Sequence, residues 1–126
     1  MKPKVTALIA ARMGSSRFPG KTLSDLCGKS MLERLIERIK FSKNIDNIVV
    51  ATTMLEEDYL IEEWCKKNNI GCFRGSDVDV LGRLRKSAEH FKMELIVEIL
   101  GDNPLVHSSL IDDCLKLYKE KNLDYV

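Results

Sequence analysis

The feature that most constrains the fold of this chain is a regular alternation of short apolar runs with helical patterns. Each apolar run has the length of a buried strand, and apolar side chains then recur at helical spacing. Crossovers between such strands are right-handed, so the pattern predicts an α/β fold of three layers, a mostly parallel sheet with helices on both faces. The predicted strands cover residues 5–10, 48–51, 72–73 and 95–100, and a further strand is expected to begin near residue 124. We expect the strongly apolar run at residues 95–100 near the centre of the sheet.

The expected helices are marked by capping residues and by acidic first turns. Ser30 followed by Glu33 forms a capping box, and Asp79 is a favourable N-cap for a later helix. Another helix is predicted from about residue 55, where acidic residues suit the positive end of the helix dipole, and the last helix covers residues 108–121. Helical spacing predicts inward-facing side chains at Val80, Leu84, Ala88 and Phe91 in the third helix and at Leu110, Ile111, Cys114, Leu115 and Tyr118 in the fourth.

The length and charge of the chain argue against several classes of protein. Its 126 residues suffice for one core, and a net charge of +1 argues against binding of nucleic acid through bulk charge. The first apolar run is too short for the core of a signal peptide, and no stretch approaches a membrane span. The four cysteines lack C-x-x-C spacing, which favours reduced thiols in a cytoplasmic protein over a zinc site.

Residues 10–21 are the segment richest in candidate binding groups. They follow the first strand and contain Arg12, Arg17 and Lys21, two serine hydroxyls, and glycine and proline residues that prevent a regular helix. Loops at the carboxyl ends of parallel strands bind ligands in open α/β sheets, and backbone N–H groups together with Arg and Lys side chains hold phosphate oxygens. The segment is interpreted as a triphosphate cradle, with a solvated basic surface loop as the alternative.

A P-loop is a second interpretation of the same segment. Gly20-Lys21-Thr22 has the ending of a Walker A motif, but five residues separate Gly14 from Gly20 where that motif has four. Residues 23–28 also lack the helical periodicity that should follow a Walker lysine at once. A P-loop phosphotransferase is therefore the less favoured alternative, and no G-x-G-x-x-G motif follows the first strand to indicate a dinucleotide fold.

Asp102 is the candidate metal ligand. It follows the fourth strand in a Gly-Asp-Asn-Pro turn, and the same edge of the sheet should gather the loops at residues 12–21, 52–53 and 74–79. Mg²⁺ prefers hard oxygen ligands and is often held by one or two carboxylates together with substrate phosphates. The alternative is a turn aspartate that bonds its own backbone; the cationic loop at the same edge favours the metal.

Several motifs together resemble those of one enzyme family. Residues 11–21 resemble the N-terminal signature of sugar-acid cytidylyltransferases, and most closely the spore-coat polysaccharide branch. They are also similar to the CMP-Kdo and CMP-sialic acid synthetases. Supporting matches lie, in the same order as in the family, at residues 48–53, 73–76, 79–83 and 101–105.

The resemblance implies a nucleotide-diphospho-sugar transferase fold, which is Rossmann-like, and a reaction. The family couples a sugar acid to the nucleoside monophosphate of CTP, releases pyrophosphate and uses Mg²⁺, here for surface polysaccharide or glycoconjugate biosynthesis. By position, Arg12 and Lys21 are the implied catalytic residues and Asp102 the implied metal ligand. The implied nucleotide-binding set is Ala10, Arg12, Met13, Gly14, Ser15, Arg17, Lys21, Thr52, Arg74, Gly75, Ser76 and Asp79, in which residues 74–76 approach the base and ribose.

Two departures from the family pattern limit what the resemblance implies. A glutamine that contacts cytosine in the CMP-Kdo and CMP-sialic acid synthetases is replaced by Leu100, which cannot hydrogen-bond a base edge, so the preference for CTP is expected to be modest. Family members are also considerably longer. Residues 1–126 are therefore expected to be the N-terminal nucleotide-binding part, truncated before segments that supply much of the sugar site and the dimer contacts. We expect it to self-associate and to bind nucleotide with little turnover; a non-catalytic nucleotide-binding module is the alternative.

Overall fold

The structure is a computed structural model that describes residues 2–126, so Met1, the first residue of the expected 1–126 domain, lies outside the described part. Its centre is a parallel four-stranded sheet in the order β5-β4-β1-β6. The strands are β1 (Val5–Ala10), β4 (Asn47–Thr53), β5 (Gly71–Gly75) and β6 (Leu95–Leu100). Their carboxyl ends lie together, since Ala10 is in register with both Ala51 and Leu100, and Thr53 with Gly75.

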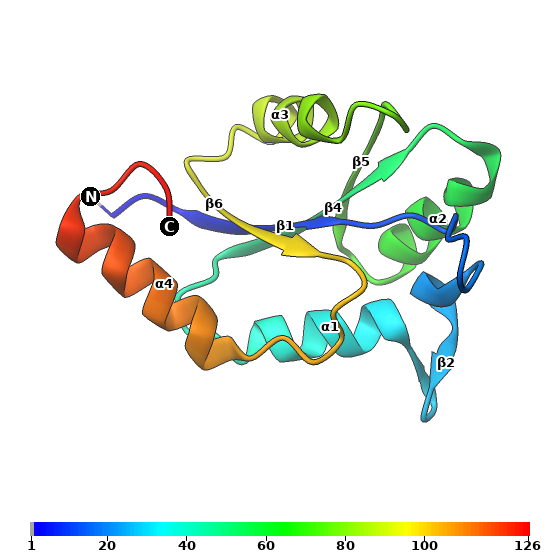
Figure 1. The fold of residues 1–126 in the computed structure, drawn as a ribbon, viewed down its shortest axis with the longest axis horizontal. Helices are drawn as coiled ribbons and strands as arrows, with labels where there is room; N and C mark the ends of the chain where they lie inside the picture. Colours follow the sequence, from blue (N-terminus) through cyan, green and yellow to red (C-terminus); the bar gives the residue numbers. More distant parts are fainter. Residues whose placement is uncertain (1) are drawn as a thin grey trace.

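One face of the sheet is covered by α1 (Met31–Lys40), α2 (Tyr59–Lys67) and α4 (Ser108–Lys121). Figure 1 shows α1 and α4 on the side of the sheet opposite to α3. The main core lies here, because alternate side chains of β1 meet the apolar stripes of these helices. Its fully buried members include Ile9, Leu35, Ile39 and Ile61.

The other face carries a single helix, α3 (Val80–His90), and a much smaller cluster. That cluster consists of Leu8, Val49, Ala51 and Leu84. With helices on both faces of a parallel sheet, the predicted three-layer α/β fold is confirmed.

The helix caps are those the sequence predicts. Ser30 Oγ accepts a hydrogen bond from the Glu33 N–H at 3.1 Å, and Asp79 Oδ1 accepts one from the Gly82 N–H at 2.9 Å. These bonds satisfy N–H groups that have no partner within the first turn of a helix. α4 has the predicted bounds, and none of the helices in the described chain is long and apolar enough to cross a membrane.

The predicted position of β6 is wrong: it lies at the edge of the sheet and pairs only with β1 within residues 2–126. Its side chains alternate in burial, with Ile99 buried and Ile96 and Leu100 exposed. Alternation is the pattern of a strand with one covered face, and Glu98 on the open face is part of it.

Other expectations differ in detail. β4 and β5 are longer than predicted, α2 begins at Tyr59 after a 3₁₀ turn η2 (Glu56–Asp58), and residues 124–126 form no strand. Residues 25–30 form a small hairpin, β2 (Asp25–Leu26) with β3 (Lys29–Ser30). Because α3 and α4 each present a narrow stripe to the sheet, several side chains predicted to face inward are exposed, namely Val80, Phe91, Leu110 and Cys114.

Candidate functional site

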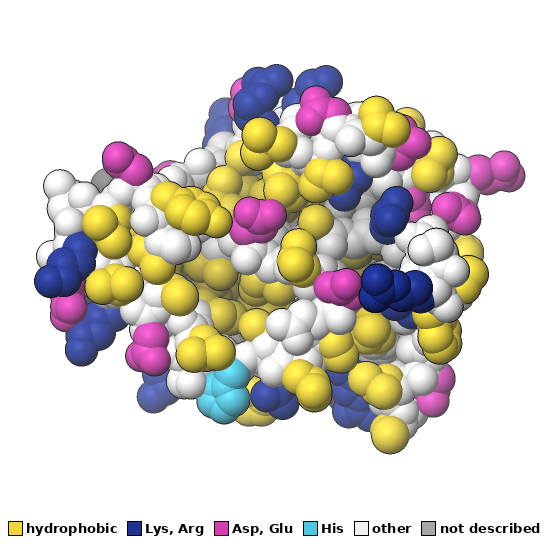
Figure 2. Space-filling view, in the orientation of Figure 1, with side chains coloured by type: hydrophobic (Ala, Val, Ile, Leu, Met, Phe, Trp, Pro, Cys, Tyr) yellow, Lys and Arg dark blue, Asp and Glu magenta, His cyan; other side chains and the backbone are white. Residues whose placement is uncertain are grey.

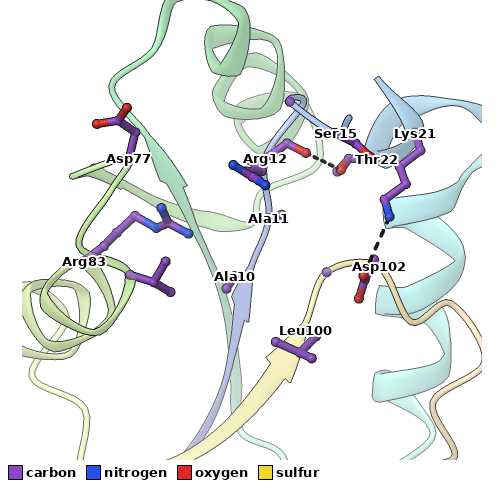
Figure 3. A pocket seen from close by; sticks show the side chains of 13 residues that line it. Ala10, Ala11, Arg12, Ser15, Lys21, Thr22, Asp77, Arg83, Leu100 and Asp102 are labelled. Carbon is purple, nitrogen blue, oxygen red and sulfur yellow. Dashed lines mark hydrogen bonds and ion pairs between the residues drawn. The ribbon is translucent and has the colours of Figure 1, made fainter. Parts of the chain in front are cut away.

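A cavity of about 340 Å³ opens at the carboxyl ends of β1 and β6, beside the start of α3. It brings together six of the residues singled out from the sequence, namely Ala10, Arg12, Gly14, Ser15, Lys21 and Asp102. Figure 3 shows their arrangement, with the side chains of Arg12, Arg83 and Lys21 around one space. A hollow of about 670 Å³ at the amino ends of the strands has Lys40 as the one Lys or Arg in its lining, so positive charge gathers at the carboxyl edge.

The loop after β1 is closed by hydrogen bonds within itself. The Gly20 N–H donates to the Met13 carbonyl at 2.7 Å, and Thr22 Oγ1 donates to the Arg12 carbonyl at 2.7 Å. Gly20 has a φ of 75°, a left-handed conformation that glycine adopts readily because it has no Cβ. The loop therefore returns on itself and places Lys21 on the same cavity as Arg12.

Asp58 anchors this loop to the rest of the fold, and the sequence analysis missed it. Its side chain is fully buried, Oδ1 accepts from the Met13 N–H at 2.6 Å, and Oδ2 accepts from the Thr53 hydroxyl. A buried carboxylate is stable only when hydrogen bonds satisfy it, and here these bonds join the end of β4 to the loop after β1. In the sequence, Asp58 looks like one of several acidic residues in a helical first turn.

Asp102 lies across the cavity from the cationic loop. Its Oδ2 is 3.7 Å from Lys21 Nζ, and both side chains are partly exposed. Gly101 makes this approach possible, because the Gly101 N–H donates to the Ala10 carbonyl at 2.8 Å and a Cβ at Gly101 would lie 2.5 Å from that oxygen. The turn after β6 is therefore pressed against the end of β1, with Asp102 at the rim.

The metal-binding prediction rests on Asp102; the other carboxylate in the lining, Asp77, lies on the Arg83 side of the cavity. Among residues 2–126, no three His, Cys, Asp or Glu side chains gather as a metal-binding group. Mg²⁺ is commonly held by one or two carboxylates together with phosphate oxygens of a bound substrate, so a single aspartate beside phosphate-binding cations suits that ion. The same site does not suit a structural zinc ion, which needs four protein ligands.

Arg83 is the second residue that the sequence analysis did not assign to the site. Its side chain comes from the first turn of α3, is 3% exposed, and points into the cavity from the side opposite Lys21. Its Nη1 donates to the Ser76 carbonyl at 2.9 Å. Burial lowers the pKa of the Arg83 guanidinium; the Asp58 carboxylate opposes this, and the nearby Arg12 charge adds to it.

Seven residues of the predicted set do not line this cavity: Met13, Arg17, Thr52, Arg74, Gly75, Ser76 and Asp79. Arg74 and Gly75 belong to β5 rather than to the loop predicted for residues 74–79, because β5 pairs with β4 as far as Thr53. Arg17 is exposed, and Thr52 is buried within β4.

Most of the polar groups in that set are engaged in local structure. Arg74 donates to the carbonyls of Thr53 and Leu55 at 2.8 and 2.7 Å, and Ser76 Oγ accepts from the Asp79 N–H at 3.0 Å. These residues shape the loop before α3. Arg83 from that helix, together with Asp77 and Val80, lines the cavity in their place.

The loop after β1 is not a P-loop. A Walker lysine stands at the start of a long helix, whereas Lys21 begins the three-residue 3₁₀ turn η1 (Lys21–Leu23). The β2–β3 hairpin follows, and the next α-helix begins at Met31. The P-loop interpretation is therefore wrong.

Comparison with known proteins gives a consistent set of relatives. The profile of a family described as "Cytidylyltransferase" matches residues 6–126. The spore coat polysaccharide biosynthesis protein SpsF of Bacillus subtilis (strain 168) is 38% identical over 122 residues, which are 94% of this chain and 51% of that protein.

Solved structures share the fold. A cytidylyltransferase from Leptospira borgpetersenii superposes with a TM-score of 0.87 at 39% identity, over 94% of this chain and 50% of that one. A CMP:2-keto-3-deoxy-manno-octonic acid synthetase complexed with CTP superposes with a TM-score of 0.81 at 23% identity, over 94% and 48% of the two chains. The chain spans about half the length of the curated relatives it matches first.

Proposed function

Because this chain belongs to the cytidylyltransferase family, we propose that it serves to activate a sugar acid with CTP, giving a CMP-sugar and pyrophosphate. The observation that carries the proposal is the cavity at the carboxyl edge of the sheet, where Arg12, Lys21 and Asp102 converge. The relatives support the choice of substrates. One is named for spore coat polysaccharide biosynthesis, and one solved structure of the same fold is a CMP-sugar-acid synthetase complexed with CTP.

In this proposal the loop after β1 holds the triphosphate. Arg12 and Lys21 contact phosphate oxygens, Gly14 and Ser15 allow the backbone to approach them, and Arg17 adds positive charge at the exposed end of the loop. A sugar hydroxyl oxygen forms the new bond to the α-phosphorus and loses its proton to solvent, the α–β phosphoanhydride bond breaks, and pyrophosphate leaves. Such a reaction depends mainly on positioning and on neutralising the charge of the leaving group, which fixed cations provide.

Asp102 is the residue that would hold Mg²⁺, in company with the phosphates. The metal ion, when bound, would neutralise phosphate charge and orient the triphosphate. Lys21 Nζ lies 3.7 Å from the same carboxylate, so the proposed phosphate-binding and metal-binding groups are neighbours.

The half-length match favours a second, narrower proposal for this segment by itself. Asp102 without further metal ligands beside it would hold Mg²⁺ weakly and leave a sugar acid unpositioned. Residues 1–126 alone are therefore expected to bind nucleotide with little turnover. The remainder of the sugar site and further contacts between copies would come from outside these residues.

The first experiment is a thermal-shift comparison of CTP, UTP, GTP and ATP, each with and without Mg²⁺, because a ligand that binds only the folded state raises the unfolding temperature. Pyrophosphate release is then followed with CTP, Mg²⁺ and a panel of 2-keto-3-deoxy sugar acids, with light scattering to give the oligomeric state. Stabilisation by CTP supports the proposal. If none of the four triphosphates raises the unfolding temperature, the proposal is contradicted.

Lys21→Ala tests the assignment of the cradle. Losing a hydrogen bond to a charged group costs about 1.5–3 kcal/mol, so CTP should bind at least about tenfold more weakly. The unfolding free energy should hardly change, because the lysine is partly exposed and its ion pair contributes little. Lys66→Ala, on the exposed surface of α2, is the matched control and should leave CTP affinity unchanged.

A further inference from the structure

The guanidinium of Arg83 has one edge in use and one edge free. Nη1 donates to the Ser76 carbonyl, whereas Nε is buried and has no hydrogen-bond partner within residues 2–126. Nε and Nη2 together form the other edge of the planar group, the edge that binds a carboxylate or phosphate side-on through two N–H donors. A buried donor without a partner costs free energy, so its retention here points to a partner that binds from the cavity.

The surrounding residues hold Arg83 in this position. Its backbone N–H donates to the Asp79 carbonyl, and its own carbonyl accepts from the Ser87 hydroxyl at 2.8 Å. Gly75 leaves room for the stem of the side chain, since a Cβ there would lie 3.1 Å from Arg83 Cγ. The side chain is therefore fixed by local packing before any ligand arrives.

Carboxylates lie near Arg83, but none of them forms an ion pair with it among residues 2–126. Arg12 points into the same space, and neither guanidinium forms an ion pair within the described part of the chain. The charges of Asp58 and Asp77 both act on Arg83, but the oxygens of Asp58 accept from Met13 and Thr53, and Asp77 forms no ion pair with Arg83 in the described chain. Two arginines that face one cavity, neither of them held in an ion pair by the described residues, favour binding of an oxyanion between them.

We infer that the free Nε edge of Arg83 forms, with Arg12, a second oxyanion site in this cavity, on the side away from Lys21. Its ligand is a phosphate of the nucleotide or the carboxylate of the sugar acid, the two oxyanions that the proposed reaction brings together. The inference rests on the proposed function and adds a residue that fixes the reacting groups. It also explains why a helix that covers the sparse face of the sheet buries an arginine there.

The test compares Arg83→Met and Arg83→Lys with the unchanged chain. Methionine fills the volume without charge or donors, and lysine keeps the charge but loses the two-donor edge. Arg85→Met, on the exposed side of the same helix, is the matched control. Circular dichroism and thermal unfolding establish that each variant is folded, and Arg83→Lys guards against a folding defect in Arg83→Met.

Calorimetric titrations use CTP, CMP, cytidine, sodium tripolyphosphate and a 2-keto-3-deoxy sugar acid. If the site takes a phosphate, both Arg83 variants bind CTP and CMP at least about tenfold more weakly and cytidine unchanged. If it takes the carboxylate, nucleotide affinities stay the same and sugar-acid affinity falls by a similar factor. The Arg85 variant should match the unchanged chain in every titration.

Two results overturn the inference. One is unchanged affinity of Arg83→Lys and Arg83→Met for every probe, and the other is an equal loss for cytidine and CMP, which would mean that Arg83 contacts the nucleoside. Failure of the proposed function looks different: the unchanged chain would bind tripolyphosphate but would not distinguish CTP from it. In that case the tripolyphosphate titration of the Arg83 variants still decides whether the oxyanion site exists.

Discussion

The two faces of the sheet differ in what covers them and in what they do. Three helices and a large apolar cluster cover one face, whereas α3 and four buried apolar residues cover the other. The cavity with Arg12, Lys21 and Arg83 opens on the sparse side, beside α3 and the open face of β6. Figure 2, in the orientation of Figure 1, shows apolar side chains exposed over this part of the molecule, with isolated charges among them.

Two arginines illustrate the difference. Arg74 of β5 lies on the packed side, beside α2, and donates to the carbonyls of Thr53 and Leu55. Arg83 of α3 lies on the sparse side and keeps one edge of its guanidinium free. Arg74 therefore serves the fold, whereas Arg83 keeps donors for the proposed ligand. The contrast concerns these two arginines, because the buried Thr52 Oγ1 of β4 also lacks a hydrogen-bond partner among residues 2–126.

The largest expected effect is on the packed face. Leu35 of α1 is fully buried in the main cluster, so Leu35→Ala should lower the unfolding free energy by about 2–5 kcal/mol. Urea denaturation followed by circular dichroism measures this loss. On the sparse face, Leu100→Ala serves as the control, because its side chain is 63% exposed and the expected change is within about 0.5 kcal/mol. If the two variants lose similar amounts of unfolding free energy, the two faces do not differ in stability as we infer.

Arg74→Ala should lower the stability of the fold more than it lowers CTP affinity. The side chain is 15% exposed and joins β5 to the segment after β4, so its removal should cost about 1–3 kcal/mol of unfolding free energy. CTP affinity should fall less than in Arg83→Met. The control is Arg85→Ala, whose exposed pair with Glu89 contributes little. If Arg74→Ala unfolds like the unchanged chain and loses nucleotide affinity or base discrimination, Arg74 belongs to the base wall that the family resemblance implies.

Leu100→Gln should alter selectivity on the sparse face without altering stability. The family resemblance places a cytosine-contacting glutamine at this position, and Leu100 lines the cavity in register with Ala10. A new hydrogen bond contributes about 0.5–1.5 kcal/mol, so the preference for CTP over UTP should rise by up to about tenfold. Competition titrations with the two nucleotides measure it. Ile96→Gln, on the same face of β6 but outside the cavity, should change neither affinity. An unchanged preference in Leu100→Gln would separate this position from the base.

The sequence predicts those parts of the fold that depend on neighbouring residues. The caps at Ser30 and Asp79 and the bounds of α4 follow from local hydrogen bonding and periodicity, and the structure shows them, although of the two bonds of a capping box only the one to Ser30 Oγ is present among the described residues. The edge position of β6 could not be predicted in this way, because strand order depends on contacts between distant segments.

The same limit applies to the site. The cationic loop and Asp102 are marked in the sequence by glycine, proline and charge, and the structure places Arg12, Lys21 and Asp102 on one cavity. Asp58 and Arg83 look like ordinary charged helix residues. Their burial arises only when helix and loop pack together, and no local pattern records it.

The smallest expected effect on stability is that of Glu37→Gln, on the solvent side of α1. A small effect there would show that the apolar side of this helix, rather than its charged side, stabilises the packed face. A hydrogen bond from Lys29 lowers the pKa of the exposed Glu37 carboxyl below its ordinary value. A lowered folded-state pKa stabilises the fold above the unfolded-state pKa, and this contribution is lost as the pH falls through the folded-state value. Glu37→Gln should therefore be slightly less stable than the unchanged chain at pH 7 and equal to it in strong acid. Urea denaturation at low salt, at pH 7 and about pH 3, measures the difference, with Glu56→Gln as a control that lacks an ion pair in the described chain. If Glu37→Gln lowers the unfolding free energy by the same amount at both pH values, Glu37 acts through packing rather than charge, and the solvent side of α1 also stabilises the packed face.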